Sequence, residues 1–370
     1  MAYPKTITAL KDVPGMPDDL RQGLGPVTDQ FEFMSNEYYL SLIDWNDPHD
    51  PIRRIIIPCA EELEEWGHLD PSDESRYSVM RGMQHKYESI ALLLASDVCG
   101  GYCRFCFRKR LFICPEQRET LTDLDAAVDY IRGHREINNV LITGGDGLML
   151  STARLERIIA GLRKIDHVRI IRVGTKLPAY NPHRILNDPD LIRLVEQYSR
   201  PDRRIYFMVH FNHPREITRY SEAACDMLMR AGAVLCNQTP LLRGVNDTPE
   251  VMGDLFNRLA FIGVPPYYVF LCRPTVGNLP FAVPVEEAHR VFQEAKNRCS
   301  GLGKRAKLTM SHTTGKIEVV ASTPDQTIFQ YHRAAIPEQS GEVIICKKNP
   351  GAYWFDDYQE IVEVVRLQEG

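Results

Sequence analysis

Three cysteines that could hold an iron–sulfur cluster stand close together at Cys99, Cys103 and Cys106, in the run Cys-Gly-Gly-Tyr-Cys-Arg-Phe-Cys. Thiolates at this density can bind three irons of a cubane [4Fe–4S] cluster, because such clusters are held by cysteine sulfur. No fourth cysteine follows at a matching spacing, since the next one is Cys114. One iron would therefore lack a protein ligand and could bind a small molecule.

Two other interpretations of the cysteines are a structural zinc site and a set of ordinary buried thiols. Zinc sites usually pair two CxxC-type hooks or add histidines. Neither pattern accompanies these cysteines, so the spacing favours the cluster.

The composition is typical of an ordinary soluble globular protein: of 370 residues, 44% are hydrophobic and 25% are charged. A net charge of −5 gives no reason to expect a nucleic-acid partner. No apolar run is long enough to span a bilayer, and the first residues lack the apolar core of a signal peptide. Ten cysteines without a secretion signal indicate a reducing compartment. We expect a cytoplasmic protein without a membrane partner.

From residue 91 onward, short apolar runs alternate with longer amphipathic stretches, which predicts repeated βα units. The predicted strands are Ala91–Ser96, Asn139–Thr143, Val168–Val173, Arg204–Phe211, Ala233–Cys236 and Tyr267–Leu271. The predicted helices between and after them are Leu124–Arg135, Thr152–Lys164, Pro189–Tyr198, Ser221–Ala231, Pro249–Ile262 and Val285–Cys299. Six such units with right-handed crossovers make a partial (β/α)6 barrel or an open α/β sheet.

The rest of the chain flanks these units. Residues 1–85 are rich in Pro and Asp and predict an N-terminal cap with helical stretches near Asn36–Ile43 and Ala60–Trp66. Residues 86–304 form the predicted barrel. Residues 305–370 contain short strand-like runs and predict a small C-terminal extension.

A polar cluster follows each of the six predicted strands. In order these are the three cysteines, Gly144-Gly145-Asp146-Gly147, Gly174-Thr175-Lys176, His210-Phe211-Asn212-His213, Asn237-Gln238-Thr239 and Cys272-Arg273. Parallel α/β folds bind ligands at the carboxyl ends of their strands. All six clusters therefore fall on one rim, where we expect the active site.

Each cluster also has a purely structural interpretation. Gly144, Gly145 and Asp146 could form a tight turn with a helix-capping carboxylate, or the glycines could let a ligand approach the backbone. His210 and His213 are assigned to ligand contact and not to a metal. Gln238 could contact a ligand or hold a loop.

Taken in order, these motifs resemble the lysine 2,3-aminomutase family of radical S-adenosylmethionine (SAM) enzymes, for which CxxxCxxC is the signature spacing. The resemblance covers roughly residues 35 to 320. The runs that carry it are Tyr-Tyr-Leu-Ser-Leu-Ile-Asp-Trp from Tyr38, Asp-Pro-Ile-Arg-Arg from Asp50, the cysteine run, Leu-Ile-Thr-Gly-Gly-Asp from Leu141, His-Phe-Asn-His-Pro from His210, Asn237-Gln238, and Leu-Leu-Arg-Gly-Val-Asn-Asp from Leu241.

The resemblance implies a radical SAM barrel of the TIM type and an isomerase mechanism. SAM on the open iron is split into methionine and a 5′-deoxyadenosyl radical, which takes a hydrogen from the β-carbon of an amino acid held as an aldimine of pyridoxal phosphate (PLP). The amino group then moves from carbon 2 to carbon 3. It further implies an electron donor (a reductase with flavodoxin or ferredoxin) and a homo-oligomer. The cofactors carry the hard chemistry, and the protein positions them.

The family pattern also assigns residues. Gly144, Gly145 and Asp146 match the segment that meets the methionyl amine of SAM, and His210 and Gln238 match polar contacts around SAM. Further matches are Arg108 with the arginine that pairs with the substrate α-carboxylate, and Lys316 with the PLP lysine. A planar guanidinium suits a carboxylate.

The PLP site departs from the family pattern. Lys86 and Ile90 stand where two arginines that help to hold PLP are expected. Lys86 keeps the charge, whereas Ile90 cannot contact a phosphate. Ser-His-Thr-Thr-Gly precedes Lys316 in place of a glycine-rich run.

The substrate site departs as well. Arg273 stands where the lysine mutase has an aspartate for the substrate ε-ammonium. A guanidinium repels an ammonium group and pairs with a carboxylate, so we predict an acidic substrate such as glutamate or aspartate and not free lysine. Arg273 could instead turn to a surface carboxylate or contact the PLP phosphate.

Three alternative functions remain open from the sequence. The chain could modify a lysine of a protein, because the Cys-Phe-Arg-Lys-Arg run resembles the branch of the family that modifies an elongation factor. It could also carry out radical chemistry without PLP. The non-enzyme alternative is an iron–sulfur redox sensor, which would not need the polar clusters of the rim.

Overall fold

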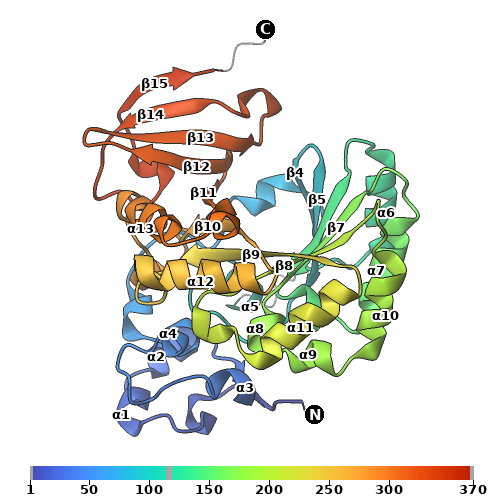
Figure 1. Ribbon diagram of the computed structural model, residues 1–370, viewed down its shortest axis with the longest axis horizontal. Coiled ribbons are helices and arrows are strands. Elements are labelled where there is room, and N and C mark those ends of the chain that lie inside the picture. The colour runs from blue at the N-terminus through green and yellow to red at the C-terminus, as the bar shows by residue number, and fades with distance from the viewer. Residues whose placement is uncertain (1–2, 114–118, 367–370) are drawn as a thin grey trace.

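The computed structural model describes residues 3–113 and 119–366, and Cys114 lies outside the described residues. Seven neighbouring strands of one sheet run parallel (Figure 1). They are β5 (Ile90–Ser96), β6 (Asn139–Gly144), β7 (Ile170–Thr175), β8 (Ile205–Val209), β9 (Val234–Leu241), β10 (Pro266–Leu271) and β11 (Lys307–His312). The order along the sheet is the order along the chain, as right-handed βαβ units produce. The predicted α/β fold, a partial TIM-like barrel, is confirmed.

Amphipathic helices cover the outside of these strands. The six long helices are α6 (Leu124–Gly133), α7 (Thr152–Arg163), α10 (Pro189–Tyr198), α11 (Arg219–Arg230), α12 (Pro249–Phe261) and α13 (Val285–Asn297). In α7, Leu155, Ile158, Ile159 and Leu162 form one buried stripe, which is the helical periodicity that the sequence shows. Side chains of Asp, Ser or Thr cap five of the six helices by accepting a backbone N–H, which satisfies a donor that the helix leaves free.

The N-terminal cap is built from short elements. They are β1 (Thr6–Ile7), β2 (Ser35–Asn36), α1 (Asp18–Arg21), α2 (Gly25–Gln30), α3 (Glu37–Leu40) and α4 (Pro51–Ile56). The cap is fastened to the barrel by buried hydrogen bonds: the Tyr39 hydroxyl donates to Glu216 at 2.6 Å, and the Asn36 amide donates to the Tyr180 carbonyl at 2.9 Å. It lies below the barrel in Figure 1, beside the small helices α5 (Arg110–Ile113), α8 (Leu177–Tyr180) and α9 (His183–Leu186).

Antiparallel strands extend both edges of the parallel sheet. At one edge are β3 (Ser78–Met80) and β4 (Met83–Tyr87); beyond β11 are β12 (Gly315–Ser322), β13 (Gln326–Ala334), β14 (Val343–Lys347) and β15 (Ile361–Val365). The predicted C-terminal extension thus continues the sheet of the barrel. In the described residues, 3-10 turns are η1 (Leu10–Asp12), η2 (Ala60–Leu63), η3 (Glu74–Tyr77), η5 (Gly147–Met149), η6 (Pro214–Glu216), η7 (Leu279–Phe281), η8 (Gly301–Arg305), η9 (Pro337–Gln339) and η10 (Phe355–Asp357).

The barrel is open between its two flanks, since β3 and β15 end the sheet without pairing with each other. Side chains join the β3–β5 flank to the β11–β13 flank across this opening, which we call the seam. The Tyr77 hydroxyl donates to the Thr313 carbonyl at 2.9 Å, and the Lys86 ammonium donates to the His312 carbonyl at 2.6 Å. Among the described residues, helices of sufficient length and hydrophobicity to cross a membrane are absent.

Candidate active site

The loop that carries the three cysteines follows β5 and is held by the N-terminal cap. Arg104, between the second and third cysteines, is buried and binds Glu62 with Nε at 3.0 Å and Nη2 at 2.9 Å. Its Nη1 donates to the Glu32 carbonyl at 2.9 Å. A buried ion pair with further hydrogen bonds fixes the loop in one place, so the cap sets the position of the thiols.

The thiols themselves are half-buried at the carboxyl end of β5. Burial raises the pKa of all three and brings that of Cys103 to about 12. In the described chain, Cys, His, Asp and Glu side chains do not gather in threes around one point that could hold a single metal ion. The donor set of three thiols on one loop, without a histidine or a second CxxC pair beside them in the sequence, fits a cubane cluster in which each thiolate binds a different iron.

The glycines after β6 pack against the beginning of the cysteine loop. Gly144 has a φ of +128°, and a Cβ at this position would lie 2.1 Å from the Ser96 carbonyl oxygen. A Cβ on Gly145 would lie 2.4 Å from the Val98 carbonyl oxygen, and the Gly145 N–H donates to the Ser96 carbonyl at 2.7 Å. The two glycines therefore position the cysteine loop, because no side chain fits between the two backbones.

Asp146 forms a buried turn. Its carboxylate accepts from the Leu148 N–H at 2.9 Å and from the Lys176 N–H at 2.6 Å, and so caps the following 3-10 turn. Burial raises the pKa of this carboxyl, and the hydrogen bonds oppose that effect. The structural interpretation of Gly-Gly-Asp thus describes the observed local geometry, and contact with SAM stays a prediction.

His210 and Gln238 are half-buried residues whose side-chain polar groups are free. Neither side chain has a hydrogen-bond partner among residues 3–113 and 119–366. Burial, together with the charges of Lys176 and Arg108, lowers the pKa of His210 to about 3. Its imidazole is neutral at neutral pH and can both donate and accept. Both side chains are therefore available to a bound ligand.

Two details differ from the sequence-based expectation. Gln238 lies inside β9, opposite Tyr268 of β10, and not beyond the strand end at Cys236. His213 caps a 3-10 turn, since its ring accepts from the Arg215 N–H at 3.1 Å.

Lys176 is a positioning residue to which the sequence analysis gave no role. Its ammonium donates to Glu216 at 2.6 Å, to the Asn212 side chain at 2.6 Å and to the His210 carbonyl at 3.0 Å. These contacts hold the His-Phe-Asn-His-Pro turn against β7. Its place directly after a predicted strand, in Gly-Thr-Lys, was the available signal.

Arg108 already has a carboxylate neighbour in Glu74 of the cap. Arg108 Nη2 lies 2.7 Å from one oxygen of Glu74, and Arg110 Nη2 lies 2.6 Å from the other. Burial by itself would raise the pKa of the Glu74 carboxyl. The charges and hydrogen bonds of the two guanidinium groups have the larger effect and hold this pKa below its usual range. Arg110 also pairs with Glu119 through Nε at 2.9 Å, so the carboxylates of Glu74 and Glu119 balance the two guanidinium groups.

Lys316 projects from β12 toward aromatic rings of β10. Its Nζ lies 4.0 Å from the centre of the Tyr268 ring and 5.2 Å from that of Phe270. In the described residues this ammonium has no hydrogen bond or ion pair. Burial, followed by the charges of Arg172 and Arg273, lowers its pKa to about 7. A lysine that is half neutral near pH 7 fits imine chemistry with an aldehyde.

Four more cations surround Lys316 and, with it, form what we call the cationic group. Their hydrogen bonds go to neutral atoms: Lys86 to the His312 carbonyl at 2.6 Å, Arg172 to Asn139 Oδ1 at 2.8 Å, Arg273 to Ser72 Oγ at 2.9 Å and Arg333 to Ser89 Oγ at 3.0 Å. No carboxylate of the described residues lies within 4.0 Å of any of the five.

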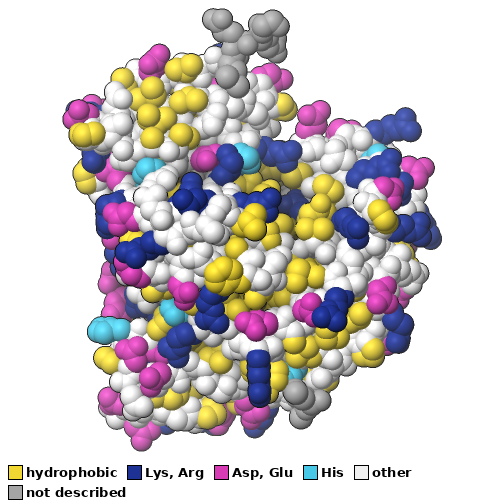
Figure 2. Space-filling view, in the orientation of Figure 1, with side chains coloured by type: hydrophobic (Ala, Val, Ile, Leu, Met, Phe, Trp, Pro, Cys, Tyr) yellow, Lys and Arg dark blue, Asp and Glu magenta, His cyan; other side chains and the backbone are white. Residues whose placement is uncertain are grey.

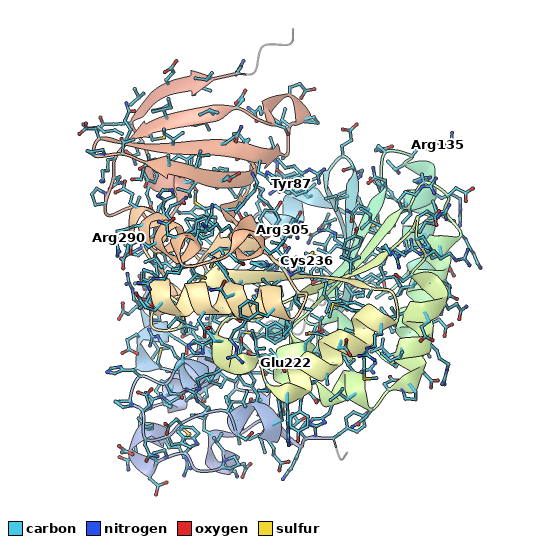
Figure 3. All side chains as sticks on the ribbon, in the orientation of Figure 1. Tyr87, Arg135, Glu222, Cys236, Arg290 and Arg305 are labelled. Atoms are coloured by element: carbon cyan, nitrogen blue, oxygen red, sulfur yellow. The ribbon has the colours of Figure 1, made fainter. Side chains whose placement is uncertain are left out.

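This charge excess has a definite place in the fold. Tyr87, labelled in Figure 3, lies where the C-terminal sheet meets the barrel, and both Lys86 and Arg333 approach its ring, at 5.7 and 5.4 Å. Lys and Arg side chains also gather along this junction on the surface (Figure 2). Burial lowers the pKa of Lys86 to about 8 and that of Arg273 to about 10. Cations kept from water without counter-charges are costly, so this region fits an anionic ligand such as PLP.

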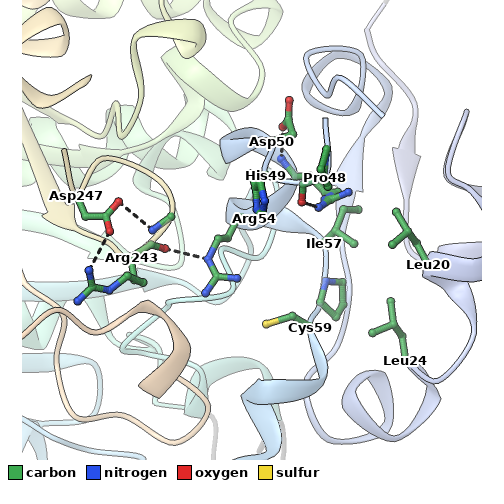
Figure 4. Close-up of a pocket in the computed structure, with 13 residues that line it drawn as sticks. Leu20, Leu24, Pro48, His49, Asp50, Arg54, Ile57, Cys59, Arg243 and Asp247 are labelled. Atoms are coloured by element: carbon green, nitrogen blue, oxygen red, sulfur yellow. Dashed lines mark hydrogen bonds and ion pairs between the residues drawn. The ribbon is translucent and has the colours of Figure 1, made fainter. Parts of the chain in front are cut away.

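A separate cavity of about 420 Å³ opens between α4 of the cap and the loop after β9 (Figure 4). None of the predicted site residues lines it. Its arginines are already engaged: Arg54 Nε donates to the Arg243 carbonyl at 2.9 Å, and Arg243 pairs with Glu287 at 2.7 Å. We therefore place the candidate active site inside the barrel.

Comparisons with known proteins agree on one kind of enzyme. A protein of Aquifex aeolicus with the name "Putative L-lysine 2,3-aminomutase" is 50% identical over 97% of this chain and 96% of its own length. L-lysine 2,3-aminomutase of Clostridium subterminale is 38% identical over 80% and 70%, and glutamate 2,3-aminomutase of Clostridioides difficile is 35% identical over 74% and 64%.

Two other comparisons add nothing to this. No family model matches the chain. A solved radical SAM methyltransferase from Sphaerobacter thermophilus is 20% identical over 62% of this chain and 68% of its own, with a TM-score of 0.42, a likeness too low to carry an argument.

Proposed function

The chain belongs to the lysine 2,3-aminomutase family of radical SAM isomerases, and from this premise we propose that it moves the α-amino group of a free acidic amino acid to the β-carbon. Enzymes of this family use a [4Fe–4S] cluster, SAM and PLP. The cluster with SAM supplies a radical that abstracts hydrogen, and PLP supplies a conjugated system that supports the migrating amino group.

The cluster half of the proposed site rests on Cys99, Cys103 and Cys106. Their thiols must lose protons on binding iron. The neutral imidazole of His210 and the free amide of Gln238 would orient SAM beside the open iron. Burial of this loop between cap and barrel keeps water and competing hydrogen donors away from a reactive species.

The PLP half rests on Lys316, the predicted attachment point. Its amine is a nucleophile near neutral pH because burial and neighbouring cations disfavour the ammonium form. The substrate α-carboxylate would bind beside Arg108, whose Nη1 has only a long contact of 3.4 Å, to Thr143. A planar guanidinium with free donors suits that carboxylate.

The observation that carries the substrate class is Arg273. Its guanidinium lies 3.6 Å from the centre of the Phe107 ring, turned inward, and donates to Ser72 with no carboxylate partner in the described chain. The side-chain carboxylate of glutamate or aspartate would complete it, whereas the ε-ammonium of lysine would add a further cation to five that are unpaired. Like charges in a region of low dielectric repel strongly.

A screen of free amino acids tests this proposal. Anaerobically reconstituted enzyme with SAM, PLP and dithionite is incubated with glutamate, aspartate, lysine or alanine, and β-isomers are measured by mass spectrometry. We expect turnover of an acidic amino acid and none of lysine. Release of 5′-deoxyadenosine by SAM cleavage is measured in the same samples, and its complete absence would remove the radical mechanism altogether.

Arg273→Asp separates substrate recognition from a general role. This variant should weaken the kcat/KM for the acidic substrate far more than that for an uncharged amino acid. Arg305→Asp, which changes an exposed arginine in the same way, is the control (Figure 3). Equal losses for acidic and uncharged substrates would show that Arg273 does not read the side chain.

A further inference from the structure

Ile90 occupies a position where the family pattern expects an arginine of the PLP site, and a guanidinium from another element lies next to it. Ile90 begins β5, and its neighbour Ser89 accepts a hydrogen bond from Arg333 Nη2 at 3.0 Å. Arg333 belongs to β13, on the other flank of the seam. A guanidinium therefore reaches the beginning of β5 from a strand that is distant in the sequence, one residue from the position where the family pattern expects an arginine.

The register of the C-terminal sheet brings this guanidinium beside Lys316. Lys316 in β12 pairs directly with Arg333 in β13, and the two strands are antiparallel. Residues opposite each other in such a pair have Cβ atoms about 5 Å apart on the same face of the sheet. PLP carries its aldehyde and its phosphate arm on adjacent ring carbons, so a group that binds the phosphate must lie close to the lysine that holds the aldehyde.

Lys86 lies at the same end of the site. It precedes Tyr87, which pairs with Ile90, and both Lys86 and Arg333 approach the Tyr87 ring. After burial, the charge of Arg273 is the largest influence that lowers the pKa of Lys86, and it also acts on Lys316, so these three cations share one region.

We propose that Arg333 takes the place of the arginine missing at position 90 and binds the phosphate of PLP, with Lys86 as the second cation and the Ser89 hydroxyl as a neutral donor. The side chain of Arg333 has a single hydrogen bond among the described residues, to Ser89, so the other N–H groups of its guanidinium are available for a phosphate. The inference rests on the proposed use of PLP by this chain.

The test compares PLP with pyridoxal, which has the aldehyde and lacks the phosphate. The affinity of each for the anaerobically reconstituted protein is measured by absorbance titration, without substrate or turnover, for the wild type and for Arg333→Gln. We expect Arg333→Gln to weaken the binding of PLP roughly 10- to 100-fold more than that of pyridoxal, because a change in the pKa of Lys316 affects both compounds alike. Arg305→Gln, at an exposed arginine, should change neither.

Arg333→Lys protects the test against a folding defect. Lysine keeps the positive charge but lacks the planar guanidinium that donates two parallel hydrogen bonds. The PLP affinity of this variant should therefore lie between those of the wild type and Arg333→Gln. Recovery of PLP affinity when Ile90→Arg is added to Arg333→Gln would show that the two positions serve one phosphate.

Three outcomes would overturn the inference. Unchanged PLP affinity in Arg333→Gln would place the phosphate elsewhere, and equal losses for PLP and pyridoxal would reduce Arg333 to a structural role. If the wild type binds no PLP at all, the use of PLP in the proposed function fails as well. Only that last result affects both proposals.

Discussion

Lys316 should form an imine at a pH where an ordinary lysine does not. Burial and the neighbouring cations lower its pKa to about 7, from an ordinary value of 10.5. At pH 7 about half of the Lys316 side chains would then be neutral, against roughly one in three thousand for a lysine at the ordinary value. Arg273 is one of the cations responsible, so Arg273→Gln should move the pKa of Lys316 upward.

The assay follows the second-order rate constant of imine formation with pyridoxal between pH 5.5 and 10, at the absorbance of the imine. Pyridoxal is used because it has no phosphate and so reports on the amine alone. We expect the rate to rise with a midpoint near pH 7 in the wild type, a higher midpoint in Arg273→Gln and no change in Arg305→Gln. Lys316→Ala should remove the signal.

The reasoning fails if the wild type and Arg273→Gln share a midpoint near pH 10, because Lys316 would then behave as an exposed lysine. It also fails if the absorbance band persists in Lys316→Ala, since another lysine would then hold the aldehyde.

Three further predictions concern the framework of the site. Glu62→Gln leaves the buried guanidinium of Arg104 unpaired and should lower the free energy of unfolding by about 3–5 kcal/mol in urea titrations, with loss of bound iron; retention of both would contradict a role in holding the cysteine loop. Gly144→Ala should abolish iron binding because its Cβ meets a backbone oxygen at 2.1 Å, whereas Gly133→Ala, with open space around it, should keep iron. The pKa of Lys316 is lower in the folded than in the unfolded chain, so between about pH 7 and 10.5 the unfolded state binds more protons; the unfolding free energy of the wild type relative to Lys316→Met should rise with pH across that window and stay flat if the pKa is ordinary.

The parallel strands and the long helices could be predicted from the sequence because their signals are local. The apolar periodicity of α7 or the apolar run of β5 reports the element directly, and the topology of a parallel sheet then collects the polar segments on one rim. Pro189–Tyr198 begins and ends where the sequence predicts. The strand β9 was predicted too short, because Asn237 and Gln238 are polar residues inside a strand and resemble a loop.

The contacts across the seam could not be predicted in this way. Arg333 lies beside Lys316 only through the pairing of β12 with β13, and a slip of one residue would turn its side chain to the other face. Glu74 in a 3-10 turn of the cap meets Arg108 only after the cap has folded onto the barrel. Asp146 is compatible with a ligand contact and with a helix cap, and only its neighbours decide between them.

If PLP binds as proposed, the position of the cationic group at the seam would give it a structural role besides its chemical one. Lys86 and Ser89 belong to one flank of the open barrel, whereas Arg333 and Lys316 belong to the other. In the described residues, carbonyl and hydroxyl acceptors are the partners of these cations across the seam, so charge repulsion between Lys86, Arg333 and Lys316 works against closure. A phosphate bound between Lys86 and Arg333 would attract both cations, so that their charges would then favour closure of the two flanks. Saturating PLP should therefore raise the melting temperature of the wild type more than pyridoxal does, because a ligand that binds only the folded state stabilises it. In Arg333→Gln the two compounds should raise it equally, and a full PLP-specific rise in that variant would mean that the phosphate does not join the flanks through Arg333.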